Sequence, residues 1–275
     1  MRNRIFFGLI ALGLVAAGII FQNCNKDKVA NGKAETINSQ VGNLVNPFEQ
    51  YGIWHNECLE YMFSQPNAFS LPYDTLWQKF GAPFFQQVFG GNYKPISLND
   101  LHAAYQKTYN IVENKQYLKV LKEMVDVGMI NPNYTSPYIG RNNYQILLDY
   151  FTFLTNHKVK TKADYLIAHN KLCEIEQEIL ANYYELVSNG ITVYPEYDGV
   201  LSCMSVFRNS SEFWKDSHYS SVDDWYYNKK VACMDAMAYN QQIVFDYWES
   251  EMTGQPLNDR NSVIYSGYIS GGVLK

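Results

Sequence analysis

The chain has 275 residues, with 22 Lys or Arg against 27 Asp or Glu, which gives a formal net charge of −5 at pH 7. This acidic balance argues against nucleic acid as a partner, because binding to phosphates requires clustered basic side chains. It also argues against attachment to an anionic membrane through a basic surface patch.

The N-terminus has the form of a secretory signal. An uncharged apolar run at residues 5–21 follows Arg2 and Arg4, which is the order of a signal peptide. A spanning helix needs roughly 17–25 apolar residues, so this run is at the short limit. Cys24 follows shortly after, where bacterial lipoproteins carry their modified cysteine. We therefore expect residues 1–23 to be a lipoprotein signal peptide and Cys24 to be lipidated; an uncleaved membrane anchor is the alternative.

Three further segments are expected after the leader. Residues 24–45 are polar and lack apolar periodicity, which predicts a flexible tether. Residues 46–255 show no internal repeat and no break in composition, which predicts one helical domain. Residues 256–275 contain little to bury and end in a glycine-rich run, which predicts a loose C-terminal tail.

The apolar pattern is helical along most of the predicted domain. Asn46 before Pro47 predicts the start and the N-cap of the first helix. Ser97 followed by Asp100 predicts a capping box. No strand pattern is long enough for a sheet, and only residues 191–199 suggest a short extended stretch. The expected fold class is therefore all-α, a single bundle of about seven or eight helices. Its later helices are expected over residues 116–127, 142–156, 162–188, 199–214 and 222–252.

Aromatic residues make up 16% of the chain and include 23 Tyr. One explanation is an aromatic surface that binds glycans or peptides. The other is that tyrosines line contacts between helices, with the hydroxyl at the rim. We favour the second explanation, because many tyrosines fall on the apolar helical stripes.

Four cysteines follow Cys24 in the chain. Outside the cytoplasm they could form disulfides, and the sequence leaves their pairing open. Buried free thiols are the alternative, because each cysteine lies among apolar helical positions. The spacing of the four does not fit a structural zinc site. They are Cys58, Cys173, Cys203 and Cys233.

His55 and Asn56 are the most suggestive polar pair. A histidine beside an asparagine could serve as an acid–base catalyst with an orienting group. His55 also shares an apolar stripe with Leu59 and Gly52, which favours a structural histidine, since no partner nucleophile is identifiable. Gly52 lowers the stability of its helix by about 1 kcal/mol relative to Ala, which indicates the close approach of another backbone.

Two other groups of residues could bind a ligand. Arg208 could hold a carboxylate and Trp214 could be a ligand platform; the alternative is a buried Arg–acid pair beside a core tryptophan. His169, Cys173 and Glu176 lie on one helical face at a spacing that could hold a metal. We expect no metal there, because the flanking positions are apolar.

Two stretches carry a family resemblance. "NPFEQYGIWHN" at residues 46–56 and "SVFRNSSEFW" at residues 205–214 resemble stretches of an uncharacterised lipoprotein family of the Bacteroidota. "NKDK" at residues 25–28 is similar to the stretch after the lipidated cysteine in surface lipoproteins of the same group. The resemblance implies a helical domain on the bacterial cell envelope, and it brings no established activity.

The expected function is therefore an exported domain with a binding or structural role. Its partners would be the membrane, through the lipid anchor, and an envelope protein or glycan. One alternative is an envelope hydrolase with a non-standard site around His55, and another is a glycan-binding surface lipoprotein. The sequence has no nucleophile elbow, P-loop or dinucleotide fingerprint, and it indicates no cofactor.

Overall fold

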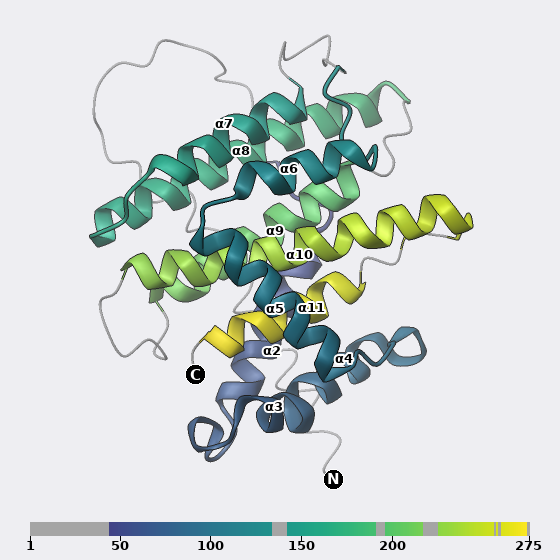
Figure 1. The fold of residues 1–275 in the computed structure, drawn as a ribbon. Coiled ribbons are helices and arrows are strands. Elements are labelled where there is room, and N and C mark those ends of the chain that lie inside the picture. The colour runs from purple at the N-terminus through teal and green to yellow at the C-terminus, as the bar shows by residue number, and fades with distance from the viewer. Residues whose placement is uncertain are drawn as a thin grey trace. The chain divides into compact units, whose positions relative to one another are not determined.

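The computed structural model of this chain describes residues 44–133, 142–190, 196–216, 225–255, 257 and 260–273. Within these residues the regular structure is helical and no strand occurs, so the expected all-α class is confirmed (Figure 1). No helix in the described part of the chain combines the length and apolar character that crossing a membrane requires. Nine described helices have eight residues or more: α2 (Glu49–Phe63), α4 (Ala82–Phe89), α5 (Leu98–Glu113), α6 (Tyr117–Asp126), α7 (Asn143–Asn156), α8 (Lys162–Ser188), α9 (Glu196–Asp216), α10 (Trp225–Thr253) and α11 (Arg260–Val273).

Helix α10 is the central element of this arrangement. All ten residues from 231 to 240 are buried, and Asp235 is the one charged residue in that stretch, "VACMDAMAYN". A helix that is apolar on every side belongs in the interior, and its alanines allow neighbours to approach closely. Helix α10 accordingly packs against α9 and α11, and also against α5 and α6 (Figure 1).

Helices α2 and α9 approach each other at Gly52. A Cβ atom at this position would lie 2.5 Å from the backbone oxygen of Ser205 and 2.3 Å from the amide nitrogen of Asn209. The Gly52 N–H also donates to Ser205 Oγ at 3.3 Å. The close approach of another backbone that the sequence predicts at Gly52 is therefore confirmed.

The start of the first helix differs from its prediction. Helix α2 begins at Glu49, so Asn46 lies before the helix and is not its N-cap. The amide of Asn46 donates to Glu176 on α8 and to the carbonyl of Leu201 on α9, at 2.7 and 2.8 Å. Of the capping box predicted at Ser97, the N-cap half is present, because the Ser97 Oγ accepts from the Asp100 N–H at 3.2 Å.

The C-terminal segment is the main correction to the expected organisation. Residues 260–273 form α11, which packs against α10 and α2, so the predicted loose tail is wrong for these residues. Small residues on the inner face of α11 allow this close packing. Ser266 donates to the Asp235 carbonyl at 3.0 Å, and a Cβ atom at Gly267 would lie 3.2 Å from the Phe85 ring.

Two other stretches lacked a helical prediction. The segment before α4 contains α3 (Tyr73–Leu76) and a π-helical turn, Trp77–Gly81. A Cβ atom at Gly81 would lie 2.3 Å from the Trp77 ring, so glycine makes room for this side chain. Of the stretch predicted to be extended, residues 191–195 lie outside the described residues and residues 196–199 begin α9.

Candidate ligand site

Arg208 lies on α9 and joins it to α8 and α2. Its Nε donates to Glu176 Oε2 at 2.6 Å, and its Nη2 donates to Glu49 Oε2. The amide of Asn46 donates to the other oxygen of Glu176, and the amide of Asn209 donates to the other oxygen of Glu49. Each carboxylate oxygen therefore has a donor. The buried Arg–acid arrangement that the sequence left open is present, with two acids instead of one.

The electrostatics of this cluster hold Arg208 in place. Burial acts to lower the pKa of Arg208, but the carboxylates of Glu176 and Glu49 outweigh it and raise the pKa. Burial raises the pKa of Glu49, and the opposing effects of Arg208 and Asn209 do not cancel it. The Arg208 guanidinium binds two carboxylates of the protein itself, and the cluster thereby connects α9 to α8 and α2.

His55 lies in a second buried cluster around Asp235 of α10. The His55 Nε2 and the Asp235 Oδ2 are 3.4 Å apart, and both side chains are 0% exposed. The same Asp235 oxygen accepts from Ser210 Oγ at 2.5 Å and from Ser270 Oγ at 2.9 Å. The Trp214 Nε1 also donates to it, at 3.5 Å. Trp214 is therefore a core residue that helps to satisfy a buried carboxylate.

Asn56 orients His55 from the adjacent position. Its Oδ1 lies 3.0 Å from His55 Nδ1, and its amide donates to the Asn209 carbonyl at 2.9 Å. A His–Asp pair is chemically suited to acid–base catalysis. Catalysis also requires that a substrate reach the ring, and neither His55 nor Asp235 has any exposed surface.

His169 is engaged within the protein. Its Nε2 lies 3.1 Å from Glu212 Oε2, and its Nδ1 lies 3.1 Å from Ser211 Oγ. The Cys173 Sγ is 3.7 Å from the same Nε2, whereas Glu176 binds Arg208 instead. Over the described residues, no group of three His, Cys, Asp or Glu side chains could hold a metal ion.

The cysteines are mostly part of the core. Cys58, Cys203 and Cys233 are buried free thiols, as in the alternative that the sequence left open. Burial raises the pKa of each of them. Cys173 is half-buried beside His169. Cys24 lies outside the described residues.

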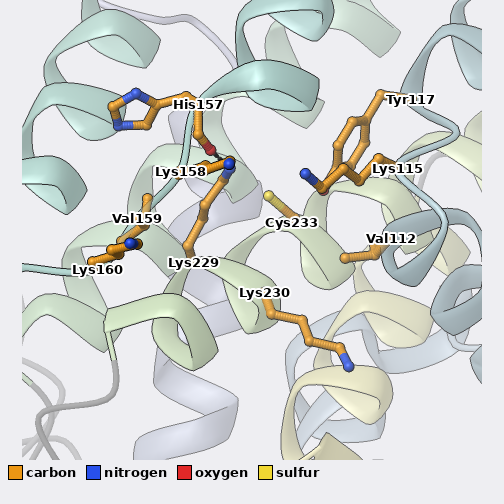
Figure 2. A pocket seen from close by; sticks show the side chains of 10 residues that line it. All are labelled: Val112, Lys115, Tyr117, His157, Lys158, Val159, Lys160, Lys229, Lys230 and Cys233. Atoms are coloured by element: carbon orange, nitrogen blue, oxygen red, sulfur yellow. Dashed lines mark hydrogen bonds between the residues drawn. The ribbon is translucent and has the colours of Figure 1, made fainter.

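A pocket of about 290 Å³ opens on another side of α10 (Figure 2). It lies where the end of α5 and the start of α6 meet α10 and the connection between α7 and α8. Its lining includes five lysines, one histidine and no acidic residue. The ten lining residues are Val112, Lys115, Tyr117, His157, Lys158, Val159, Lys160, Lys229, Lys230 and Cys233.

The end of α7 positions two of these lysines. Lys229 Nζ donates to the carbonyls of Leu154 and His157, both at 3.1 Å, and Lys115 Nζ donates to the Thr155 carbonyl at 3.2 Å. The last carbonyls of a helix lack partners within the helix and carry partial negative charge, so cations are favoured there. Burial lowers the pKa of Lys229; Cys233 opposes this effect, and the charge of Lys115 adds to it.

Two more lysines project from the connection between α7 and α8. Val159 is buried between Lys158 and Lys160, which are both exposed. Both lysines therefore face solvent at the pocket rim. Neither lysine forms an ion pair with any residue that the structure describes. Their charge is therefore available to a ligand.

The base of the pocket is apolar. Val112, Val159, Tyr117 and Cys233 are each at most 5% exposed. Figure 2 shows the Cys233 sulfur between the side chains of Lys229 and Lys115. Because burial raises the pKa of Cys233 despite the opposing effect of Lys229, its thiol is protonated at neutral pH. The pocket therefore combines an apolar base with a cationic rim.

Lys230 differs from the other lysines of the lining. Its Nζ forms an ion pair with Glu113 at 2.5 Å and lies 4.3 Å from the centre of the Tyr109 ring. In Figure 2 its side chain extends away from Cys233. Lys230 therefore contributes less charge to the pocket than Lys158 and Lys160 do.

This site was not predicted from the sequence, because the net charge of the whole chain is negative. The local signals are two short basic runs, "HKVKTK" at residues 157–162 and "NKK" at residues 228–230. These runs are about 70 residues apart, and only the packing of α10 against the end of α7 brings them together. The sequence candidates His55, Asn56, Arg208 and Trp214 lie in the buried clusters and do not line the pocket.

No family model, no curated protein and no solved structure matches this chain.

Proposed function

We propose that this protein is a lipid-anchored domain of the bacterial envelope that binds a small organic anion in the lysine-lined pocket. One observation carries the proposal: five lysines and no acid line a pocket in a chain whose net charge is −5. Grouping like charges in this way costs stability, and an anionic ligand would offset that cost. The fold alone would not require Lys158 and Lys160 to be basic, since neither is needed to cap α7.

The dimensions and lining indicate the kind of anion. Ligand pockets have volumes of roughly 300–1,000 Å³, so this one, at about 290 Å³, suits a small molecule. Charge-assisted hydrogen bonds from lysines would bind a carboxylate or phosphate group. The apolar base of Val112, Tyr117 and Cys233 would contact a small hydrocarbon body.

The two alternative functions have less support. A hydrolase around His55 needs access for a substrate, and the His55–Asp235 pair has no exposed surface. A glycan platform needs exposed rings that lie flat together. The exposed rings of Phe245 and Trp248 are inclined by 40° to each other. Every tyrosine whose side chain is described is buried or half-buried, as expected for tyrosines in contacts between helices.

Calorimetric titration with a set of small anions tests the binding proposal. Acetate, lactate, benzoate and phosphate would be compared with the neutral amide of lactate. We expect at least one anion to bind and the amide not to bind. The double variant Lys158→Gln/Lys160→Gln should weaken binding by at least tenfold. The matched control is Lys79→Gln/Lys94→Gln, which removes the same charge from exposed positions outside the lining. Equal weakening by both double variants would contradict the proposal.

The lipid anchor needs its own experiment, since Cys24 lies outside the described residues. The mass of the N-terminal fragment from native membranes should correspond to an acylated cysteine at position 24. The Cys24→Ala variant should lack this species. An N-terminus that begins at Met1 would contradict the lipid anchor and would leave the pocket proposal untouched.

A further inference from the structure

Lys229 has an environment that the other lysines of the pocket do not share. It is half-buried, and its Nζ is held by the Leu154 and His157 carbonyls at 3.1 Å each. No carboxylate lines the pocket, so only the partial negative charge of these two carbonyls favours the ammonium form of Lys229. Lys115 is bound at the same helix end and repels a second positive charge there.

The hydrogen bonds of Lys229 also suit a neutral amine. A neutral primary amine has two N–H donors and one lone pair. The two carbonyls accept both donors, which leaves the lone pair as the unused group of the nitrogen. Cys233 provides no anion at neutral pH, because burial raises the pKa of its thiol. Burial lowers the pKa of Lys229 itself, and the charge of Lys115 adds to this effect against the opposing effect of Cys233.

We propose that Lys229 is a nucleophile that forms an imine with a small anion bearing a carbonyl group, such as a 2-oxo acid. A lysine becomes nucleophilic when it is desolvated or lies beside another cation, and Lys229 meets both conditions. The inference rests on the proposed function, because the rim lysines Lys158 and Lys160 would hold the carboxylate of the ligand. It adds the chemical class of the ligand and a covalent step.

The step is balanced without any further reactant. The lone pair of Lys229 Nζ attacks the carbonyl carbon, and a proton passes from nitrogen to the carbonyl oxygen to give a carbinolamine. The C–O bond then breaks, the hydroxyl group leaves with the second proton of the nitrogen as water, and a C=N bond forms. Hydrolysis reverses the sequence and releases the ligand, so the reaction supports reversible covalent capture.

Reductive trapping tests this inference on the whole exported chain. The protein would be incubated with pyruvate and sodium cyanoborohydride at pH 7, and each modified lysine would be located by peptide mass. We expect one reduced pyruvate adduct per chain, on Lys229. Lys229→Arg keeps N–H donors for the two carbonyls but cannot form the imine, and it should lose this adduct. Lys115→Arg is the matched control and should retain the adduct on Lys229.

Lactate separates this inference from the proposed function, because it has the same carboxylate but no carbonyl group. Binding of lactate and pyruvate by calorimetry without an adduct on Lys229 would overturn the imine and leave anion binding intact. Absence of both binding and adduct would overturn both proposals. An adduct on Lys115, or spread evenly over exposed lysines such as Lys79 and Lys94, would also overturn the assignment to Lys229.

Discussion

Arg208 Nε donates to Glu176 Oε2 at 2.6 Å, and this bond joins α9 to α8. Arg208 also donates to Glu49 on α2. The two acids have side chains that are 3% and 12% exposed, respectively. Removal of the guanidinium would leave two carboxylates of like charge without their cation, away from most of the solvent.

Arg208→Met is therefore expected to be strongly destabilising. Loss of one partner of a buried ion pair lowers the free energy of unfolding by about 3–5 kcal/mol. The triple variant Arg208→Met/Glu49→Gln/Glu176→Gln should regain much of this loss, since it leaves no charge behind. Urea unfolding measures both effects. A loss below about 1 kcal/mol in Arg208→Met would show that the cluster matters little.

Gly52→Ala tests the close contact between α2 and α9. Alanine favours a helix over glycine by about 1 kcal/mol, but its methyl group would lie 2.5 Å from the backbone oxygen of Ser205. We expect a net loss of about 1–3 kcal/mol in unfolding free energy, as for overpacked cores. Gly91→Ala is the control, because a Cβ atom at Gly91 meets nothing within 4 Å. Equal stability of the two variants would refute the contact.

Asp235 is the acceptor on which the inner cluster depends. Asp235→Leu would leave the donors of Ser210, Ser270 and Trp214 without their acceptor, at a cost of about 1–3 kcal/mol for each buried group. Asp235→Asn keeps an oxygen for these donors and should be much better tolerated. Thermal and urea unfolding of the two variants test this order. The reverse order, with the leucine variant the more stable, would contradict the cluster as described.

Glu212 makes the stability of the fold sensitive to acid. Burial acts to raise its pKa, but His169 and Lys215 bind its carboxylate and lower the pKa from 4.5 to about 2. The folded state thus favours the ionised form, so this stabilisation is complete above pH 4.5 and is lost as the pH falls towards 2. Glu212→Gln should flatten the fall in stability over that range. The exposed control Glu251→Gln should keep the wild-type slope, and a slope unchanged by Glu212→Gln would disprove the assignment.

The sequence predicted helices best where apolar spacing and capping residues agree. The helix after Ser97 is an example, because the Ser97 Oγ accepts from the Asp100 N–H at the start of α5. The prediction for the C-terminal segment that forms α11 was wrong, because glycine and serine in the "SGYISGG" stretch suggested a loose tail. The same small residues in fact permit α11 to pack closely against α10. Local propensity could not reveal this, because the packing of α11 against α10 and α2 is a tertiary contact.

The candidate sites show the same limit. The sequence identified His55 as a polar residue on an apolar stripe and Arg208 as a possible partner of a carboxylate, and the structure places both in buried clusters. Their partners Asp235 and Glu49 come from other helices, so spacing along one helix could not identify them. The lysine-lined pocket combines residues from three separate stretches of the chain, 112–117, 157–160 and 229–233. A net charge for the whole chain conceals a local excess of this kind.

The most direct test of the central claim is a lysine side-chain NMR titration with lactate, in protein that carries isotope-labelled lysine. Binding in the pocket should shift the signals of Lys158 and Lys160 along one saturating curve, with Lys115 and Lys229 following. The signals of Lys79 and Lys94, which do not line the pocket, should remain in place. Small, unsaturated shifts of equal size at all exposed lysines would show only ionic screening, and would contradict an anion-binding pocket at this site.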